Sequence, residues 1–408
     1  MRTALIGKTM SDSYLIVLGA GPHQAPAYRT ASRLGLKTLS LDYNEKAEAI
    51  PLADEFIQVS VNNRNAEECI ARLRERNLPY AGVIASGIEV SPLASAIAKE
   101  FGLTWSAEQT AYETTNKCAR SEVLQKAGIP IPKFEVMDGP GFPSMELPFV
   151  VKPSDNSGSR GVRVVNTKGE WGSAYQEALS LAGDGRVVVE ELLQGDEISI
   201  EGFVLDGEMI VHGFSDRNFS SGYEPYFMED GSTSPSKLAP SVVAEAKAVF
   251  ARAVKALGIT EGPSKGDLLV TKEGIKVLEV TSRLSPLFPM TAPYTTGADP
   301  LEATIRWATK MPIPHSLLEP KFNKAMAHRY FFHQPGKVTD IEGLDGLENQ
   351  PGVKVVVHLQ EFAVGDVLTP PSYINRLFYI ATVADDRDSA VAQAESALKT
   401  VRITTEAV

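Results

Sequence analysis

Cysteine is scarce in this chain, which has only Cys69 and Cys118 among its 408 residues. The two lie far apart and show no metal-ligand spacing, so neither a disulfide framework nor a cysteine-based zinc site is expected. We expect reduced thiols in a cytoplasmic protein, and no nucleophilic role for either cysteine.

Long apolar runs are also missing from the chain. No segment approaches the roughly 20 apolar residues that a bilayer-spanning helix needs, so no membrane partner is expected. The first thirteen residues lack the apolar core of a signal peptide. We therefore expect a soluble globular protein whose N-terminal residues form a loose extension.

Runs of basic residues do not occur, and the formal net charge is −11. This charge argues against a nucleic-acid partner, and any anionic ligand must meet locally placed cations. The composition is ordinary, with 43% hydrophobic and 22% charged residues, and it shows no low-complexity tract or repeat. A chain of this length is too long for one simple core and suggests two or three domains.

Apolar strands and helical patterns alternate over about the first 110 residues. This alternation predicts an open parallel sheet of Rossmann type. The expected strands are 14–18, 37–41, 56–59 and 81–85, and the main expected helices are 65–76 and 91–101.

A glycine turn follows the first strand. Gly19 and Gly21 supply G-x-G, but Gln24 stands where the third glycine of a dinucleotide fingerprint belongs, which argues against an NAD site. We expect the C-terminal edge of the sheet, with Gly21, His23 and Glu89, to help hold a small substrate. The alternative for His23 is a loop histidine without a role.

Two apolar runs, 149–151 and 162–165, predict a pair of buried strands joined by a Ser/Gly-rich loop. Such a loop can lie over a polyphosphate, because glycine lets backbone N–H groups approach and serine donates hydrogen bonds. Lys152 at its entry and Arg160 inside it supply positive charge. The alternative is an ordinary flexible hairpin loop with solvated charges.

Two further segments would contribute to a binding site only if a nucleotide lies nearby. The helix predicted over 116–127 places Lys117 and Arg120 on one face, although such a pair is usually solvated. Carboxylates that follow the buried strand at 187–189 can accept hydrogen bonds from an adenine amino group and from ribose hydroxyls. The alternative is a solvated acidic turn. These acids are Glu190, Glu191, Asp196 and Glu197.

Asp267 and Glu279 lie in two strand-like runs joined by a tight turn. A short hairpin places them opposite each other, where like charges are destabilising. A divalent cation held between the two carboxylates would turn this repulsion into attraction. Mg²⁺ is a suitable cation, because it typically binds one or two carboxylates plus substrate phosphates. Lys265 and Arg283 flank the pair. The alternative is a register shift that separates two solvated carboxylates.

The remaining segments give weaker predictions. Residues 206–240 are expected to be irregular and to face a substrate as a flap. Within them, Arg217 is a candidate to bind a substrate carboxylate, with a surface salt bridge as the alternative. From about His328 onward we expect another α/β unit with no catalytic residue and with strands at 328–332, 353–358 and 377–383.

Taken in order, these pieces resemble the ATP-grasp superfamily over nearly the whole chain, and the layout is most similar to the L-amino-acid ligase and biotin-carboxylase-like branch. The motifs that carry the resemblance are Asn116-Lys117 with Arg120, Val151-Lys152-Pro153, the Ser/Gly loop, Glu190-Glu191 with Gly195-x-Glu197, Gly262 to Asp267, and Leu278-Glu279 with Thr281 and Arg283.

The resemblance implies an α/β and α+β ATP-grasp fold. Its parts would be a Rossmann-like N-terminal domain at 1–112, an ATP-grasp domain at 113–315 with a lid subdomain at about 133–193, and a C-terminal α/β subdomain at 316–408. The implied ligands are ATP and Mg²⁺, with Mn²⁺ as the alternative ion.

The resemblance also implies residue roles. The lysines would contact the phosphates, the serines and glycine would form a mobile lid, and the remaining residues would meet adenine and ribose. This ATP-binding set is Lys117, Lys152, Ser157, Gly158, Ser159, Glu190, Glu191, Leu193 and Glu197. Asp267 and Glu279 would bind the metal, and Arg283 would stabilise the phosphoryl group and the reacting intermediate.

Two positions depart from the family pattern. Thr281 stands two residues after the metal-binding Glu279, where the family usually has Asn. A hydroxyl is a weaker ligand than an amide oxygen, so the sequence leaves open whether a second Mg²⁺ ion binds. Lys265 occupies a position that His, Asn or Arg often fills, and we expect it to share the charge stabilisation.

The implied activity is an ATP-dependent carboxylate–amine ligase that releases ADP and phosphate. A carboxylate oxygen attacks the γ-phosphate to give an acyl phosphate, which an amine then attacks. Positioning and charge neutralisation supply most of such catalysis, so no Ser/His/Asp constellation is needed. The expected partners are a small-molecule carboxylate, with an amino acid as the leading candidate, and an amine; homodimers are common among relatives.

Two other functions stay open. The first is a carboxylase that makes carboxyphosphate from bicarbonate, although no Met-Lys-Met biotin-attachment motif is present. The second is a regulatory ATP-binding protein on a decayed fold. The presence of six residues of the family pattern speaks against decay: Lys117, Lys152, Glu197, Asp267, Glu279 and Arg283.

Overall fold

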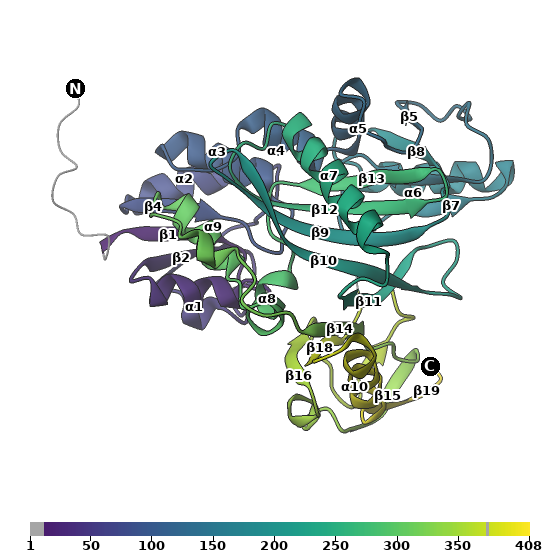
Figure 1. Cartoon of the computed structure of the whole chain (residues 1–408). Helices are drawn as coiled ribbons and strands as arrows, with labels where there is room; N and C mark the ends of the chain where they lie inside the picture. Colours follow the sequence, from purple (N-terminus) through teal and green to yellow (C-terminus); the bar gives the residue numbers. More distant parts are fainter. Residues whose placement is uncertain (1–11, 373–374) are drawn as a thin grey trace.

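The computed structural model describes residues 12–372 and 375–408 (Figure 1). The prediction of a loose N-terminal extension falls almost wholly on residues outside this range. Within it, the strands form four sheets, and none of the helices has both the length and the apolarity that a membrane span requires.

The N-terminal unit is the predicted parallel sheet, in the order β3-β2-β1-β4. Its helices follow the strands as the alternation required. The bounds are β1 (Tyr14–Leu18), α1 (Ala25–Arg33), β2 (Lys37–Asp42), β3 (Glu55–Gln58), α2 (Ala66–Arg76), β4 (Tyr80–Ile84) and α3 (Ser91–Phe101).

The glycine turn after β1 is closed by a side chain. Gln24 accepts a hydrogen bond from Gly21 N–H at 3.1 Å and donates one to Ser86 O at 2.6 Å. A Cβ on Gly19 would lie 3.3 Å from the Gln24 amide oxygen. The glutamine therefore fills the space into which a dinucleotide pyrophosphate would have to come.

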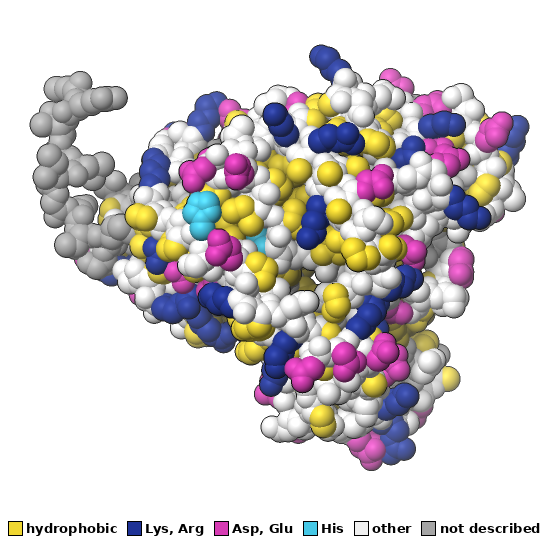
Figure 2. All heavy atoms as spheres, viewed as in Figure 1, with side chains coloured by type: hydrophobic (Ala, Val, Ile, Leu, Met, Phe, Trp, Pro, Cys, Tyr) yellow, Lys and Arg dark blue, Asp and Glu magenta, His cyan; other side chains and the backbone are white. Residues whose placement is uncertain are grey.

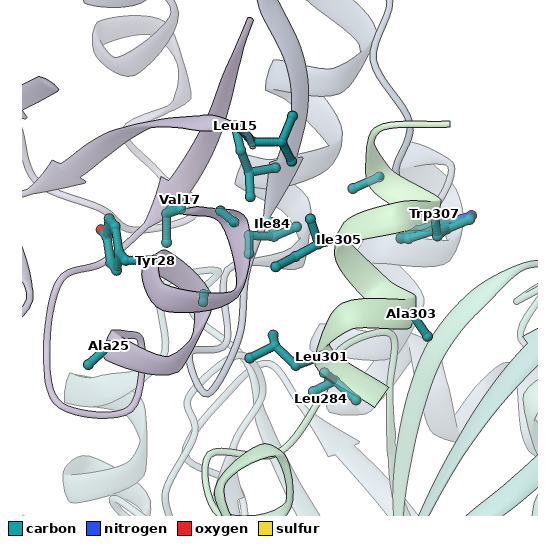
Figure 3. Close-up of a cluster of buried hydrophobic side chains, with 14 of the residues drawn as sticks. Leu15, Val17, Ala25, Tyr28, Ile84, Leu284, Leu301, Ala303, Ile305 and Trp307 are labelled. Atoms are coloured by element: carbon teal, nitrogen blue, oxygen red, sulfur yellow. The ribbon is translucent and has the colours of Figure 1, made fainter. Parts of the chain in front are cut away.

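A helix from far along the chain covers one face of this sheet. Figure 3 shows Ile305 on α9 (Pro300–Ala308) pointing toward Ile84 on β4, in a buried cluster that also contains Leu15. A Cβ on Gly82 would come within 2.7 Å of Ala308 O, so only glycine permits this close approach. The contact fastens the N-terminal unit to the rest of the chain.

A smaller antiparallel sheet, in the order β5-β8-β6-β7, holds the Ser/Gly loop at one end. Its core contains Phe149 and Trp171, which meet edge to face at 5.9 Å. The bounds of the elements here and of the two helices before them are α4 (Glu108–Thr115), α5 (Lys117–Lys126), β5 (Phe134–Met137), β6 (Phe149–Pro153), β7 (Arg163–Val165), α6 (Trp171–Leu181) and β8 (Val187–Glu191).

The large sheet runs through the middle of the molecule in the order β13-β12-β9-β10-β11-β14-β18-β16 (Figure 1). Helix α7 (Pro240–Ala256) packs on β12 and β13 through residues such as Phe250. The strands are β9 (Asp196–Leu205), β10 (Glu208–Ser220), β11 (Met228–Ser234), β12 (Gly262–Thr271), β13 (Gly274–Thr281), β14 (Ala325–Tyr330), β16 (Val353–His358) and β18 (Phe378–Ala384).

One prediction needs correction here. Residues 206–240 are not an irregular flap, because β10 and β11 occupy the middle of the large sheet. Their polar residues, such as Arg217 and Glu229, point into a cavity, so the apolar alternation that would have marked them as strands is broken.

The C-terminal strands were predicted, and three of them join the large sheet. β14 pairs with β11, and β18 and β16 continue the same sheet. The elements that complete this end of the molecule are α8 (Phe288–Thr295), β15 (Gly336–Glu342), β17 (Val367–Leu368), α10 (Arg387–Lys399) and β19 (Arg402–Glu406).

The surface in view carries both signs of charge. Figure 2 shows Lys and Arg interspersed with Asp and Glu over this face, without an extended patch of one sign. This distribution agrees with the net charge of −11 spread over the chain.

Candidate active site

Basic side chains gather beneath the Ser/Gly loop. Asn116 caps α5 by accepting from Ala119 N–H at 3.1 Å, which places Lys117 at the start of the helix. The Lys117 ammonium donates to Asn156 O, and its backbone N–H donates to Ser154 O at 2.6 Å. The first turn of α5 is thereby joined to the loop.

Lys117 is a buried cation with few compensating anions. Burial and, to a smaller extent, the neighbouring Arg120 lower the pKa of its ammonium to about 8, while Glu279 opposes the shift. Lys152 is better compensated, because it lies 2.5 Å from Glu190. A bound polyphosphate would supply the negative charge that this group of cations lacks.

The loop has the backbone expected of a phosphate lid. Gly158, Ser159 and Gly161 all have positive φ, at +65°, +55° and +72°. Arg160 folds back onto the loop and donates to Ser157 O at 3.0 Å. Residues 157–159 are exposed or half-buried, and the Ser157 N–H donates to Asn156 Oδ1 at 2.9 Å.

The acids at the end of β8 and on β9 have different partners. Glu191 is tied to the backbone before β5, because its carboxylate accepts from Lys133 N–H at 2.8 Å. Glu190 is buried and pairs with Lys152, whereas Leu193 is half-buried beyond the end of β8. Glu197 lies on β9, where Arg217 binds its carboxylate.

Asp267 and Glu279 are direct partners across the β12–β13 hairpin, so the register alternative that separated them is wrong. Lys265 donates to Asp267 and lies 3.5 Å from Glu279. Arg120 Nη1 lies 4.0 Å from Glu279 Oε1. Although burial alone raises the pKa of Glu279, Lys265 and Arg120 hold it well below its usual range.

This carboxylate pair fits a magnesium ion in a nucleotide complex. Asp267 Oδ1 is buried and has no hydrogen-bond partner among the described residues, and the same holds for Thr281 Oγ1, two residues after Glu279. The described residues contain no group of three or more His, Cys, Asp or Glu side chains that could hold a metal ion. Two carboxylates completed by phosphate oxygens match the ligand set that Mg²⁺ prefers.

Arg283 and Glu89 join the N-terminal sheet to the end of β13. Arg283 Nη2 lies 2.6 Å from Glu89 Oε2, and Thr115 donates to the other carboxylate oxygen at 3.3 Å. A parallel bridge between Ser86 and Leu284 fixes the two segments. Glu89 therefore lies at the predicted edge of the sheet, where it positions Arg283.

Arg217 is not a surface ion pair, since its side chain is only 16% exposed. Its guanidinium contacts Glu197, reaches Asp267 at 3.0 Å and Glu229 at 2.9 Å. The three carboxylates leave it little capacity for a substrate carboxylate. It connects the predicted ribose and metal ligands with the cavity described next.

A cavity of about 730 Å³ opens beside the carboxylate pair, between the large sheet, the segment 285–287 and α8. Side chains from β9, β10, β11, β12 and β14 line it. Those used below are Glu201, Arg217, Glu229, Lys265, His328 and Tyr330.

Sequence reasoning missed Glu201, Glu229, His328 and Tyr330. His328 and Tyr330 lie on β14, in the part of the chain for which no catalytic residue was expected. Burial lowers the pKa of His328 to about 3 and thereby keeps it neutral, and its Nε2 atom has no partner among the described residues. The alternation of Glu201 with apolar residues on β9 was the one signal that could have marked it as facing a site.

His23 and Gly21 lie where the glycine turn was predicted to meet a substrate. His23 Nε2 instead lies 3.0 Å from the Tyr379 hydroxyl on β18, and burial lowers the pKa of His23 to about 4. The Gly21 N–H is taken by Gln24. In this arrangement both residues serve contacts within the chain.

Comparisons with known proteins match this architecture. Residues 145–286 match the model of the ATP-grasp domain, and residues 329–406 match that of the L-amino acid ligase C-terminal domain 2. The structure of an L-amino acid ligase from Bacillus licheniformis is similar over 98% of this chain and 100% of that one, with a TM-score of 0.83 and 20% identity.

Curated proteins with similar sequences include an uncharacterized protein and a ligase. The uncharacterized protein y4rH of Sinorhizobium fredii is 25% identical over 83% of this chain and 72% of its own length. A D-alanine–D-alanine ligase B from Chromobacterium violaceum is 34% identical, over 40% of this chain and 55% of its own length. The chain therefore belongs to the ATP-grasp superfamily and is an ATP-grasp ligase of the ADP-forming, carbon–nitrogen bond-forming type.

Proposed function

We propose that the chain joins the carboxylate of an amino acid, or of a related acid, to an amine through an acyl phosphate. The observation that carries this proposal is the position of the Asp267–Glu279 pair, which lies between the basic cluster under the lid loop and the 730 Å³ cavity. Nucleotide and substrate sites on either side of one carboxylate pair are what a phosphoryl transfer to a substrate requires.

The ATP site would lie between the small antiparallel sheet and the large sheet. Lys117 and Lys152 would neutralise the phosphates, residues 157–159 would close over them, and Glu197 would meet the ribose. Closure of this loop would keep water from the acyl phosphate.

Asp267 and Glu279 would hold Mg²⁺, with Thr281 as a further oxygen ligand. When bound, the ion would neutralise charge on the phosphates. Lys265, which contacts both carboxylates, would also neutralise charge on the transferred phosphoryl group.

In the first step, a substrate carboxylate oxygen bonds to the γ-phosphorus while the bond from that phosphorus to the β–γ bridging oxygen breaks, and ADP leaves. In the second step, an amine nitrogen bonds to the acyl carbon while the carbon–oxygen bond breaks, and phosphate leaves. Arg283, held by Glu89 at 2.6 Å, would stabilise the negative charge that develops in both steps.

The full chain should be incubated with MgATP and a panel of amino acids, singly and in pairs, while phosphate release and product masses are measured. We expect release that requires a pair, and a product lighter than the two reactants by one water. A chain that binds ATP but releases no phosphate with any pair would contradict the proposal. Release that requires bicarbonate instead would identify a carboxylase.

A further inference from the structure

One buried carboxyl group in the cavity has no part in the steps above. Glu201 lies on β9 and is 5% exposed, and its side chain lines the cavity. Its cross-strand neighbours are Lys265 on β12 and Gly213 on β10. The carboxyl thus lies one strand away from the lysine that contacts both predicted metal ligands.

The carboxyl is weakly compensated for a group so deeply buried. Ser285 N–H lies 3.5 Å from Oε2, and within residues 12–372 and 375–408 no basic side chain comes within 4.0 Å. Burial raises the pKa of Glu201 to about 7, against the opposing effects of Ser285, Lys265 and Arg283. Near neutral pH the group can therefore both release and accept a proton.

The packing around Glu201 is apolar on one side and cationic on the other. Phe288 from α8 covers Gly213 so closely that a Cβ there would lie 2.5 Å from the ring and 2.9 Å from Glu201 Cβ. His212 stacks on Phe288 at 5.1 Å, and burial lowers its pKa to about 3, so it is neutral. The charged groups that face Glu201 are Lys265 and Arg283.

Those two cations are the groups that would surround the acyl phosphate. An amine that attacks the acyl carbon must therefore enter through the cavity, within reach of Glu201. In water near pH 7 an aliphatic amine is mostly an ammonium ion, which has no lone pair for the attack. Some group must remove a proton first, and a base whose proton affinity matches the working pH does so best.

We propose that Glu201 is the catalytic base that activates the acyl acceptor, which is a primary ammonium compound. The inference rests on the proposed ligase function. One ammonium proton passes to the Glu201 carboxylate, and the freed lone pair forms the carbon–nitrogen bond. The carbon–oxygen bond to phosphate then breaks, and the departing phosphate takes the second proton from nitrogen.

The competing role for Glu201 is structural. Its bond to Ser285 N–H would then only hold the segment that leads into α8, and its removal would impair every step. The two roles predict different results for a nucleophile that needs no deprotonation before it attacks. A catalytic base would then be dispensable, whereas a structural residue would still be required. Hydroxylamine is such a nucleophile, because it is largely unprotonated at neutral pH.

The test compares the wild-type chain with Glu201→Gln, whose amide oxygen can still accept from Ser285 N–H. Each is given MgATP and the acid found with the panel above, with either the amine or hydroxylamine as acceptor, and amide and hydroxamate are quantified by mass. We expect hydroxamate formation within about twofold of wild type, and amide formation at pH 7 lower by about 100-fold or more. Glu208→Gln, at an exposed position on β10, is the matched control and should leave both unchanged.

The pH dependence supplies a second test, and its wild-type arm needs no variant. Wild-type amide formation should level off above about pH 7, whereas in Glu201→Gln the residual rate should keep rising toward the pKa of the amine itself. Equal losses of amide and hydroxamate, no loss of either, or a wild-type rate that rises with the amine alone would overturn the role of Glu201. Absence of hydroxamate from the wild-type chain would instead contradict the ligase function.

Discussion

The ionisation of the Glu279 carboxylate depends on the charged side chains around it. Two carboxylates that face each other on paired strands repel, and here Lys265 and Arg120 compensate this repulsion. The arrangement keeps Glu279 ionised in a buried place, which is the state that a metal ligand needs.

Replacing Glu279 by Gln should lower the rate of ATP-dependent product formation by about 100-fold or more, because one of the two proposed metal ligands is lost. Initial rates at varied Mg²⁺ concentration measure this effect. Glu273→Gln on the same hairpin is the control, since Glu273 is exposed on the turn. Full activity of the Glu279 variant would remove this residue from the metal site.

The lowered pKa of Lys117 predicts a specific pH dependence of ATP binding. With its pKa lowered to about 8 by burial, the side chain is charged below pH 8 and becomes neutral above it. An anion binds the charged form, so the affinity for ATP should fall as the pH rises past about 8 in the wild-type chain.

Lys117→Gln should weaken ATP binding by about 10- to 100-fold at pH 7 and should remove the fall above pH 8. Isothermal calorimetry with ATP measures both. Lys126→Gln, at the exposed other end of α5, should bind as wild type. Equal affinities of the Lys117 and Lys126 variants would show that no phosphate lies at Lys117.

At the scale of the elements, β14 links the C-terminal region to the chemistry. It pairs with β11 in the large sheet and thereby places His328 and Tyr330 in the cavity wall. Tyr330 carries the Arg376 guanidinium over its ring at 3.8 Å. The C-terminal strands therefore contribute to the wall of the cavity in which we propose that the substrate binds.

His328→Gln should raise the KM for a substrate by about tenfold and leave the affinity for ATP unchanged, because its buried Nε2 has no partner among the residues that the structure describes and is available to a ligand. Steady-state kinetics and calorimetry separate the two quantities. His358→Gln on β16 is the control, since His358 is exposed. A changed affinity for ATP with unchanged KM would place the substrate elsewhere.

Elements with strong local patterns were predicted from the sequence with nearly the observed bounds. Helix α3 and strand β1 are examples, because apolar periodicity is set by the neighbouring residues alone. Strands β10 and β11 were missed, since the polar residues that line the cavity interrupt their alternation.

At the scale of the whole molecule, the units are held together by contacts between distant parts of the chain. Helix α9 lies more than two hundred residues beyond β4, yet Ile305 is fully buried against the N-terminal sheet (Figure 3). Such a contact fixes the distance between Glu89 on the N-terminal side and Arg283 on the other.

Ile305→Ala should lower the free energy of unfolding by about 2–5 kcal/mol, because it leaves a cavity between α9 and β4. The drop in thermal midpoint, followed by circular dichroism, measures it. Val364→Ala, at a position that is 61% exposed, should melt as wild type. An unchanged midpoint for Ile305→Ala would mean that α9 does not stabilise the N-terminal unit.

The sequence by itself predicted the N-terminal parallel sheet and the lid hairpin, and it indicated the pairing of Asp267 with Glu279 beside the alternative of a register shift. Short turns set the two hairpins, and local apolar periods marked the strands and helices of the parallel sheet, although β1 also pairs with β4, which lies far along the chain. The tertiary structure alone decided that β14 joins β11, that Arg217 is taken by three carboxylates, and that Glu201 lies beside Lys265 in the cavity. These placements follow from pairings between distant strands, which depend on how the whole chain buries its apolar surface and not on any local pattern.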